Sequence, residues 1–181
     1  MESEKRYEKK SKKIMKTLND LECVAKREAE GKVKVYKEQK KENRVYLNEG
    51  NHKSYFEFGD MRLEFKKSRI IIEVDTAGGV TNLVKYFFML ESPKEFDFGK
   101  IEQEKDTRLL HIFVCKSEND YLAHRKLWEY LYNNMKLKLK DMHFEAEIIL
   151  WNEKKGQDPE VESRFCELVE EAMIKEHERS G

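Results

Sequence analysis

Apolar positions along the first half of the chain change from a helical spacing to a strand-like one. Between residues 3 and 30 they recur every three or four residues, which predicts a helix with one apolar face. The apolar residues of this face are Ile14, Leu18, Leu21 and Ala25. From residue 32 onward, short alternating or continuously apolar runs predict β-strands. These strands are expected at 32–37, 44–47, 55–58, 61–65 and 69–75.

The second half of the chain alternates helical and strand-like segments. Helices are predicted over 80–90, 120–135 and 159–178, and strands over 109–115 and 144–151. The short links between the early strands favour antiparallel pairing, whereas the later strands are joined through helices and should be parallel. The most apolar runs should form the sheet centre; they are 69–75, 109–115 and 144–151. The pattern thus predicts an α/β fold: a central mixed sheet with an antiparallel meander, parallel βαβ steps and helices on both faces.

Composition limits the possibilities further. A chain of 181 residues with 39% hydrophobic residues suits a single domain, 1–181. Lys and Arg together number 36, as do Asp and Glu, so overall charge gives no argument for nucleic acid or an acidic membrane. The three cysteines form no C-x-x-C motif, so we expect free, buried thiols and no zinc ribbon. Without a signal-like or membrane-spanning apolar run, the expected location is cytoplasmic.

Three acidic residues stand out by their positions on the predicted strands. Glu73 and Asp75 are two residues apart, so they share one strand face, and the preceding turn should bring Asp60 close to Glu73. Carboxylates on an otherwise apolar strand cost free energy unless something compensates their charge. Two compensations remain open: a divalent cation such as Mg²⁺ or Mn²⁺, and ion pairs with a neighbouring basic residue such as Arg62.

The spacing Asp60-x12-Glu73-x-Asp75, followed by a helix, resembles the PD-(D/E)xK, or restriction-endonuclease-like, nuclease family. The resemblance covers residues 3–115: a helix over 3–30 and a nuclease-like core over 32–115, with 116–181 as a C-terminal extension. It implies a helix, a three-strand meander, a helix and a further strand. It also implies Mg²⁺-dependent hydrolysis of phosphodiester bonds in DNA or RNA, with Asp60 and Glu73 as metal ligands and the Val74 carbonyl as a possible third.

The chain departs from the family pattern at two positions. Gly59 stands where the family has proline, and Asp75 stands where it has the catalytic lysine. Some members carry that lysine on the following helix, where Lys85 is the candidate; Lys85 and Asp75 are therefore the expected catalytic residues. A family glutamate on the first helix has three possible counterparts that spacing does not separate: Glu4, Glu8 and Glu22. The alternative function is a non-catalytic relative that acts in binding or assembly.

Other candidate residues favour structural roles. His111, in the middle of a strand, is expected to be a hydrogen-bonded core histidine and not a metal ligand. Gly78 and Gly79 lack the nucleotide-binding spacings, so their expected role is to let the backbone turn beside Asp75. Aromatic residues at helical spacing indicate core packing or a dimer surface: Tyr86, Phe87, Phe88, Trp128, Tyr130 and Tyr132. The partners left open are nucleic acid and a second copy of the chain, with no membrane.

Overall fold

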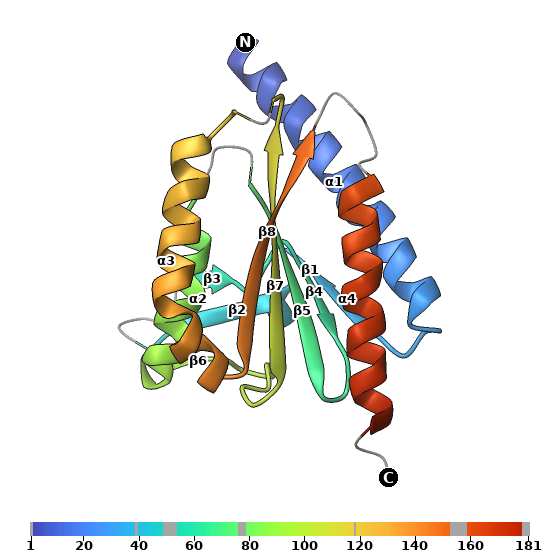
Figure 1. Cartoon of the computed structure of the whole chain (residues 1–181), viewed down its shortest axis with the longest axis vertical. Coiled ribbons are helices and arrows are strands. Elements are labelled where there is room, and N and C mark those ends of the chain that lie inside the picture. The colour runs from blue at the N-terminus through green and yellow to red at the C-terminus, as the bar shows by residue number, and fades with distance from the viewer. Residues whose placement is uncertain are drawn as a thin grey trace.

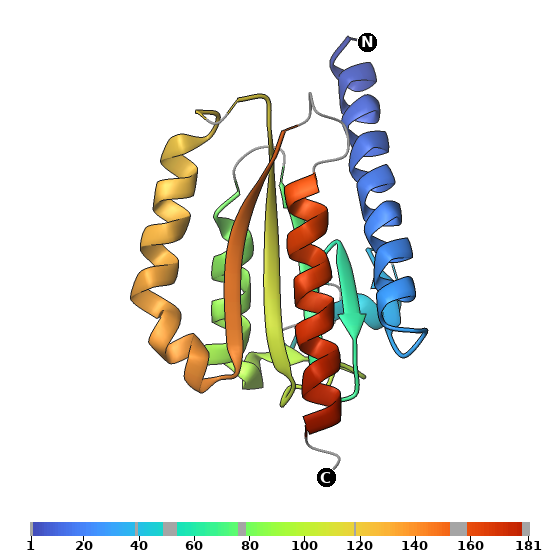
Figure 2. The same ribbon diagram turned by 45° about the vertical axis from the view of Figure 1, so that its right-hand side comes forward.

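The computed structural model of the chain has three layers, with a central sheet between two pairs of helices (Figures 1 and 2). It describes residues 2–38, 40–48, 54–75, 79–117, 119–152 and 159–178, and for 2–14 and 177–178 the backbone alone. One face of the sheet carries α1 (Glu2–Glu28) and α4 (Pro159–Glu178). The other carries α2 (Thr81–Glu91) and α3 (Leu122–Asp141). The predicted α/β class, with helices on both faces, is confirmed.

The central sheet has five strands in the order β1-β4-β5-β7-β8. Their bounds are β1 Lys34–Lys37, β4 Met61–Glu64, β5 Ser68–Asp75, β7 Asp106–Cys115 and β8 Phe144–Asn152. β1, β4 and β5 pair antiparallel, whereas β5, β7 and β8 pair parallel. The parallel steps pass through α2 and α3, because a parallel connection must return across the sheet. The predicted mixed sheet is thus confirmed.

A second, small antiparallel sheet has the order β3-β2-β6. It consists of β2 (Arg44–Leu47), β3 (Tyr55–Glu57) and β6 (Phe96–Asp97), with the short 3₁₀ helices η1 (Lys41–Asn43) and η2 (Pro93–Glu95) next to it. The two early strands that we expected near residues 44 and 55 therefore do not extend the central sheet. β1 pairs directly with β4 instead.

Side chains along β5 point alternately to the two faces of the sheet, where they pack into two separate apolar layers. Ile70 and Ile72 pack with α1 and α4, whereas Ile71 packs with α2 and α3, and all three are at most 1% exposed. This burial on both faces agrees with the predicted central position of β5. The prediction that 144–151 also lies at the sheet centre is wrong, because β8 is an edge strand. Its apolar run is explained by the helices, which cover Ile148 on one face and Ile149 on the other.

Several element boundaries differ from those expected. α3 runs to Asp141, six residues past the predicted end at 135, and Leu139 near that end is fully buried. Asp120, expected to be the first residue of this helix, lies before α3, and its carboxylate accepts hydrogen bonds from the Lys116 and Ser117 N–H groups, at 2.7 and 3.2 Å. The three cysteines are free, but only Cys115 is buried. No helix in the described parts of the chain is long and apolar enough to cross a membrane.

Candidate active site

Asp60 and Glu73 lie opposite each other where β4 begins and β5 approaches its end. Met61 pairs with Ile72, and this antiparallel register places Asp60 across from Glu73. Both therefore face the α2 side, since Ile72 faces the opposite layer. The Val74 N–H donates a hydrogen bond to Asp60 Oδ2 at 2.6 Å, which fixes that carboxylate against β5. The structure thus brings together the two residues that the sequence predicted to be neighbours.

Lys85 compensates the charge of Glu73. Its Nζ lies 2.6 Å from Glu73 Oε1 and donates a second hydrogen bond to the Glu57 carbonyl at 3.0 Å. The Tyr86 hydroxyl donates to the same Glu73 oxygen at 2.5 Å. Arg62, the expected alternative partner, instead pairs with Glu64 at 2.6 Å. Sequence reasoning missed the role of Tyr86, although this residue directly follows the lysine.

The two carboxylates of the site, Asp60 and Glu73, have less positive charge beside them than they need for full compensation. Burial, followed by the nearby negative charge of Glu73, raises the pKa of Asp60 to about 7, although the Val74 N–H and Lys85 act in the opposite direction. Burial and Glu73 also raise the pKa of Tyr86 well above its ordinary value, so its hydroxyl stays a neutral donor. A single ammonium, that of Lys85, therefore acts on two carboxylates.

Asp75 and His111 form the adjoining part of the site. The Asp75 carboxylate accepts a hydrogen bond from the Gly79 N–H and lies 4.0 Å from His111 Nε2. Trp128 Nε1 donates to His111 Nδ1 at 3.0 Å, so the neutral ring carries its proton on Nε2. Nε2 has no hydrogen-bond partner among the described residues, and burial lowers the pKa of His111 to about 4. The prediction that His111 is a hydrogen-bonded core histidine is confirmed. The sequence did not identify Trp128 as its hydrogen-bond donor.

Two glycines shape the backbone around these side chains. Gly59 has φ +95°, and a Cβ there would lie 2.6 Å from Ile71 Cγ2. Proline, whose φ is fixed near −65°, could not adopt this conformation at position 59. A Cβ on Gly79 would overlap the Asp75 carboxylate, so glycine permits the close approach beside Asp75. Gly78, predicted to share this role, lies outside the described residues.

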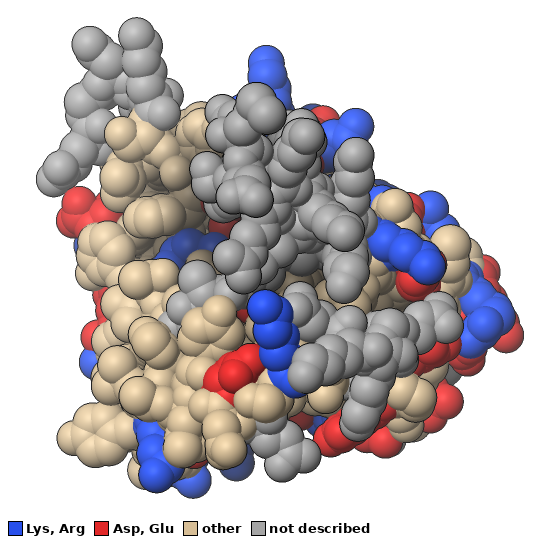
Figure 3. All heavy atoms as spheres, turned by 90° about the horizontal axis from the view of Figure 1, so that it is seen from above, with Lys and Arg blue, Asp and Glu red and all other residues tan. Residues whose placement is uncertain are grey.

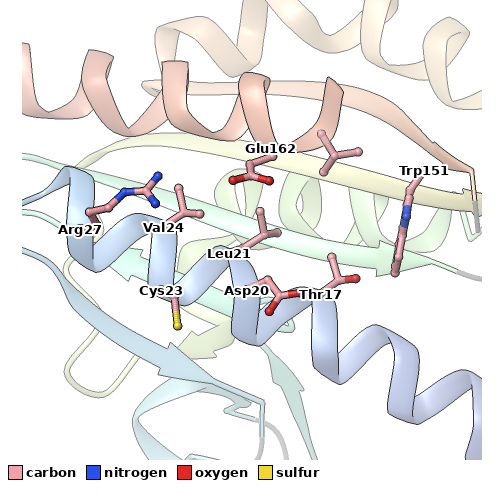
Figure 4. Close-up of a pocket in the computed structure, with 9 residues that line it drawn as sticks. Thr17, Asp20, Leu21, Cys23, Val24, Arg27, Trp151 and Glu162 are labelled. Carbon is pink, nitrogen blue, oxygen red and sulfur yellow. The ribbon is translucent and has the colours of Figure 1, made fainter. Parts of the chain in front are cut away.

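The first helix contributes no described carboxylate to the site. Glu22 pairs with Lys26 and Lys37, and α1 packs on the sheet face opposite to that of Glu73. The side chains of Glu4 and Glu8 lie outside the described part of the chain. A hollow of about 240 Å³ between α1 and α4 (Figure 4) also lies on this other face and is separate from the site. In Figure 4 the Cys23 thiol points away from α4.

The donor set of the site suits a hard cation with few protein ligands. Among the described residues, no three His, Cys, Asp or Glu side chains lie close enough together to hold a metal ion. Asp60 and Glu73 would therefore be the two carboxylate ligands, and water or substrate would complete the shell, as is usual for Mg²⁺. Seen from the upper end of the molecule in Figure 1, charged side chains of both signs gather mainly on the α1 and α4 side (Figure 3).

Comparisons of this chain with protein-family models, with curated proteins and with solved structures found no match. The fold and the site define an α/β protein with a buried carboxylate–lysine centre at the junction of β4, β5 and α2.

Proposed function

We propose that this chain is a divalent-metal-dependent nuclease-like enzyme that hydrolyses phosphodiester bonds in DNA or RNA. The observation that carries the proposal is the position of Lys85: it reaches from α2 to Glu73, directly beside Asp60. When the small-sheet strands β2, β3 and β6 are set aside, the order α1, β1, β4, β5, α2, β7 also supports it, because the resembled family has a helix, a three-strand meander, a helix and a strand. Asp60 lies at the start of the second meander strand, and Glu73 lies on the third.

Asp60 and Glu73 would hold Mg²⁺ or Mn²⁺. Two carboxylates with water suit these ions. Burial, followed by the negative charge of Glu73, raises the pKa of Asp60, and a bound cation would offset both effects. When bound, such an ion polarises the phosphoryl group and lowers the pKa of a coordinated water.

The chain's own residues would position and stabilise the reacting groups. The Lys85 ammonium, held at the Glu73 carboxylate, would orient the attacking water and offset negative charge on the phosphoryl oxygens. Tyr86 holds the Glu73 carboxylate from a second direction, which fixes its orientation. Asp75 accepts a hydrogen bond from the Gly79 N–H and so holds the backbone shortly before α2, the helix that carries Lys85.

A second function remains, and one observation favours it. Glu73 already has two hydrogen-bond donors, Lys85 and Tyr86, so its burial needs no metal ion. In this case the centre joins α2 to β5, and the chain is a non-catalytic relative that acts in binding or assembly.

Calorimetric titration with Mn²⁺, combined with a cleavage assay, separates these functions. The substrates would be single-stranded, duplex and branched DNA and RNA, each with Mg²⁺ and with EDTA. The expected result is metal binding that is lost in Glu73→Gln and Asp60→Asn, and cleavage that is lost in Lys85→Met while metal binding remains. Glu95→Gln, at an exposed carboxylate, is the matched control and should behave like the wild type.

The three possible outcomes have different meanings. Metal-dependent cleavage with this pattern of variants supports the nuclease-like enzyme. Metal binding without cleavage of any substrate favours the non-catalytic relative. An absence of any metal-dependent signal from the wild-type protein overturns the metal site itself.

A further inference from the structure

A strongly basic cavity lies at the other end of β4 from Asp60. Its volume is about 620 Å³, and it lies between the β1–β4 side of the sheet and the segment that precedes β7. Six of its eleven lining residues are cationic and three are glutamates, a formal excess of three positive charges in a chain whose net charge is zero. The cations are Lys32, Lys34, Arg62, Lys66, Lys100 and Lys105.

The inner wall of the cavity holds more buried cations than buried carboxylates. Arg62 and Lys105 are 3% and 9% exposed. Both pair with Glu64, at 2.6 and 3.0 Å, and the buried Arg69 guanidinium lies 3.4 Å from the same carboxylate. The largely buried Glu64 thus serves three buried cations, of which Lys105 also lies 3.7 Å from the exposed Glu102 carboxylate. Arg69 does not itself line the cavity, and burial lowers its pKa to about 10. A buried charge is costly when its compensation is incomplete, so this wall would be stabilised by an anion.

The mouth of the cavity adds cations that are free to reach a ligand. Lys34, Lys66 and Lys100 are exposed and have no ion-pair partner among the described residues. Inside, the Arg62 guanidinium lies over the Tyr36 ring at 4.4 Å and donates hydrogen bonds to Asn43 Oδ1, Glu64 Oε1 and the Glu42 carbonyl. A guanidinium has five N–H groups, so two remain for a ligand. The cavity therefore combines an oriented guanidinium with adaptable ammonium groups.

We propose that this cavity binds a phosphate-bearing anion with at least two negative charges. Phosphate oxygens suit an arginine fork and lysine point charges together, and an excess of three positive charges favours a multiply charged ligand over a monocarboxylate. The volume lies in the range of pockets for small organic ligands, about 300–1,000 Å³. The proposal is independent of the nuclease-like function, since Asp60, Glu73 and Lys85 do not line this cavity.

Free oligophosphates and the phosphates of a nucleic-acid strand share this chemistry, so both are used as probes. Calorimetric titrations in EDTA at low salt would use tripolyphosphate, ATP and a short thymidine oligonucleotide, with acetate as the singly charged comparison. The wild type should bind at least one phosphate probe and not acetate. Stronger binding of tripolyphosphate or ATP identifies a free ligand, and stronger binding of the oligonucleotide identifies a strand; each supports the proposal.

A pair of charge-matched triple variants tests the location. Lys34→Ala/Lys66→Ala/Lys100→Ala should raise the Kd roughly tenfold, from three exposed charge contacts. The control triple variant removes the same charge from the exposed surface of α3 and should change the Kd less than about twofold; it combines Lys126→Ala, Lys136→Ala and Lys140→Ala. Glu42→Gln removes a carboxylate from the lining and should tighten binding.

Three results would overturn the proposal. The first is that the wild type binds none of the phosphate probes. The second is equal weakening in both triple variants, which would indicate a non-specific charge effect. The third is that Glu73→Gln abolishes binding in EDTA, because the ligand would then occupy the carboxylate–lysine site and not this cavity.

Discussion

The Lys85 ammonium lies 2.6 Å from the Glu73 carboxylate, and the two side chains are only 11% and 6% exposed. Loss of one partner from a buried pair leaves an uncompensated charge, which typically costs about 3–5 kcal/mol. We therefore expect Lys85→Met to lower the free energy of unfolding by about 3 kcal/mol or more, and Lys85→Met/Glu73→Gln to recover part of that loss. Urea unfolding of the single and double variants would measure the coupling energy.

An exposed ion pair provides the matched control for this cycle. Lys138 and Glu91 join α3 to α2, with side chains 57% and 27% exposed. Solvent screening limits such pairs to about 1 kcal/mol or less, so the Lys138→Met/Glu91→Gln cycle should give a small coupling energy. Equal coupling in the two cycles would contradict the buried, structurally important position of Lys85.

A comparison of Gly59 with Gly31 would measure how much steric overlap at the candidate site lowers the stability of a Gly→Ala variant. Both have positive φ, +95° and +76°, but a Cβ at Gly31 has no neighbour within 4 Å, whereas one at Gly59 meets Ile71. Gly31→Ala should cost about 1 kcal/mol of stability from backbone strain alone. Gly59→Ala should cost about 3 kcal/mol, because overpacking adds to that strain. Thermal or urea unfolding of both variants tests the difference, and equal losses would contradict it.

The sequence predicted the central position of β5 correctly, because the residues of this strand alone indicate it. Three consecutive isoleucines in β5 indicate burial on both faces, and their burial agrees. The run in β8 is similarly apolar but forms a sheet edge, because α3 and α4 cover both of its faces. An apolar run indicates that neighbouring elements bury the two faces of a strand. It does not indicate how many strands are hydrogen-bonded to it.

The candidate site was predictable to the extent that it depends on local spacing. The connection between β4 and β5 and the two-residue period place Asp60 beside Glu73, and both can be derived from the sequence. The partner of Glu73 could not be fixed in this way, since Arg62 and Lys85 were both within plausible reach. Docking of α2 determines it, and the same docking places the Tyr86 hydroxyl, which no sequence pattern indicated.

His111 should make stability depend on pH in a defined direction. Burial lowers its folded pKa to about 4, below the usual 6.5, so the unfolded chain binds this proton more readily between these values. Stability should therefore fall as pH drops from 7 to 4, by up to about 3 kcal/mol from this residue. Asp60, with its raised pKa, contributes the opposite slope, so the quantity to measure is the difference between wild type and His111→Gln.

The exposed His124 serves as the control for this titration. Unfolding free energies of the wild type, His111→Gln and His124→Gln would be measured in EDTA at several pH values from 4 to 8. The His111→Gln curve should separate from the wild type with a changing difference, whereas the His124→Gln curve should stay parallel to it. A pH-independent difference for His111→Gln would show that the imidazole does not titrate in this way.

The C-terminal turns of α3 provide a test of the helix end that the sequence did not predict. Leu137 is 75% exposed and Leu139 is fully buried, although both lie in the same charged segment beyond residue 135. Because α3 continues to Asp141, Leu139→Ala should create a cavity and cost about 2–5 kcal/mol. Leu137→Ala should stay within about 0.5 kcal/mol of the wild type, as surface substitutions usually do. Urea midpoints with an unchanged m-value would measure both effects. Similar small losses at the two positions would mean that the helix does not pack against the sheet beyond residue 135.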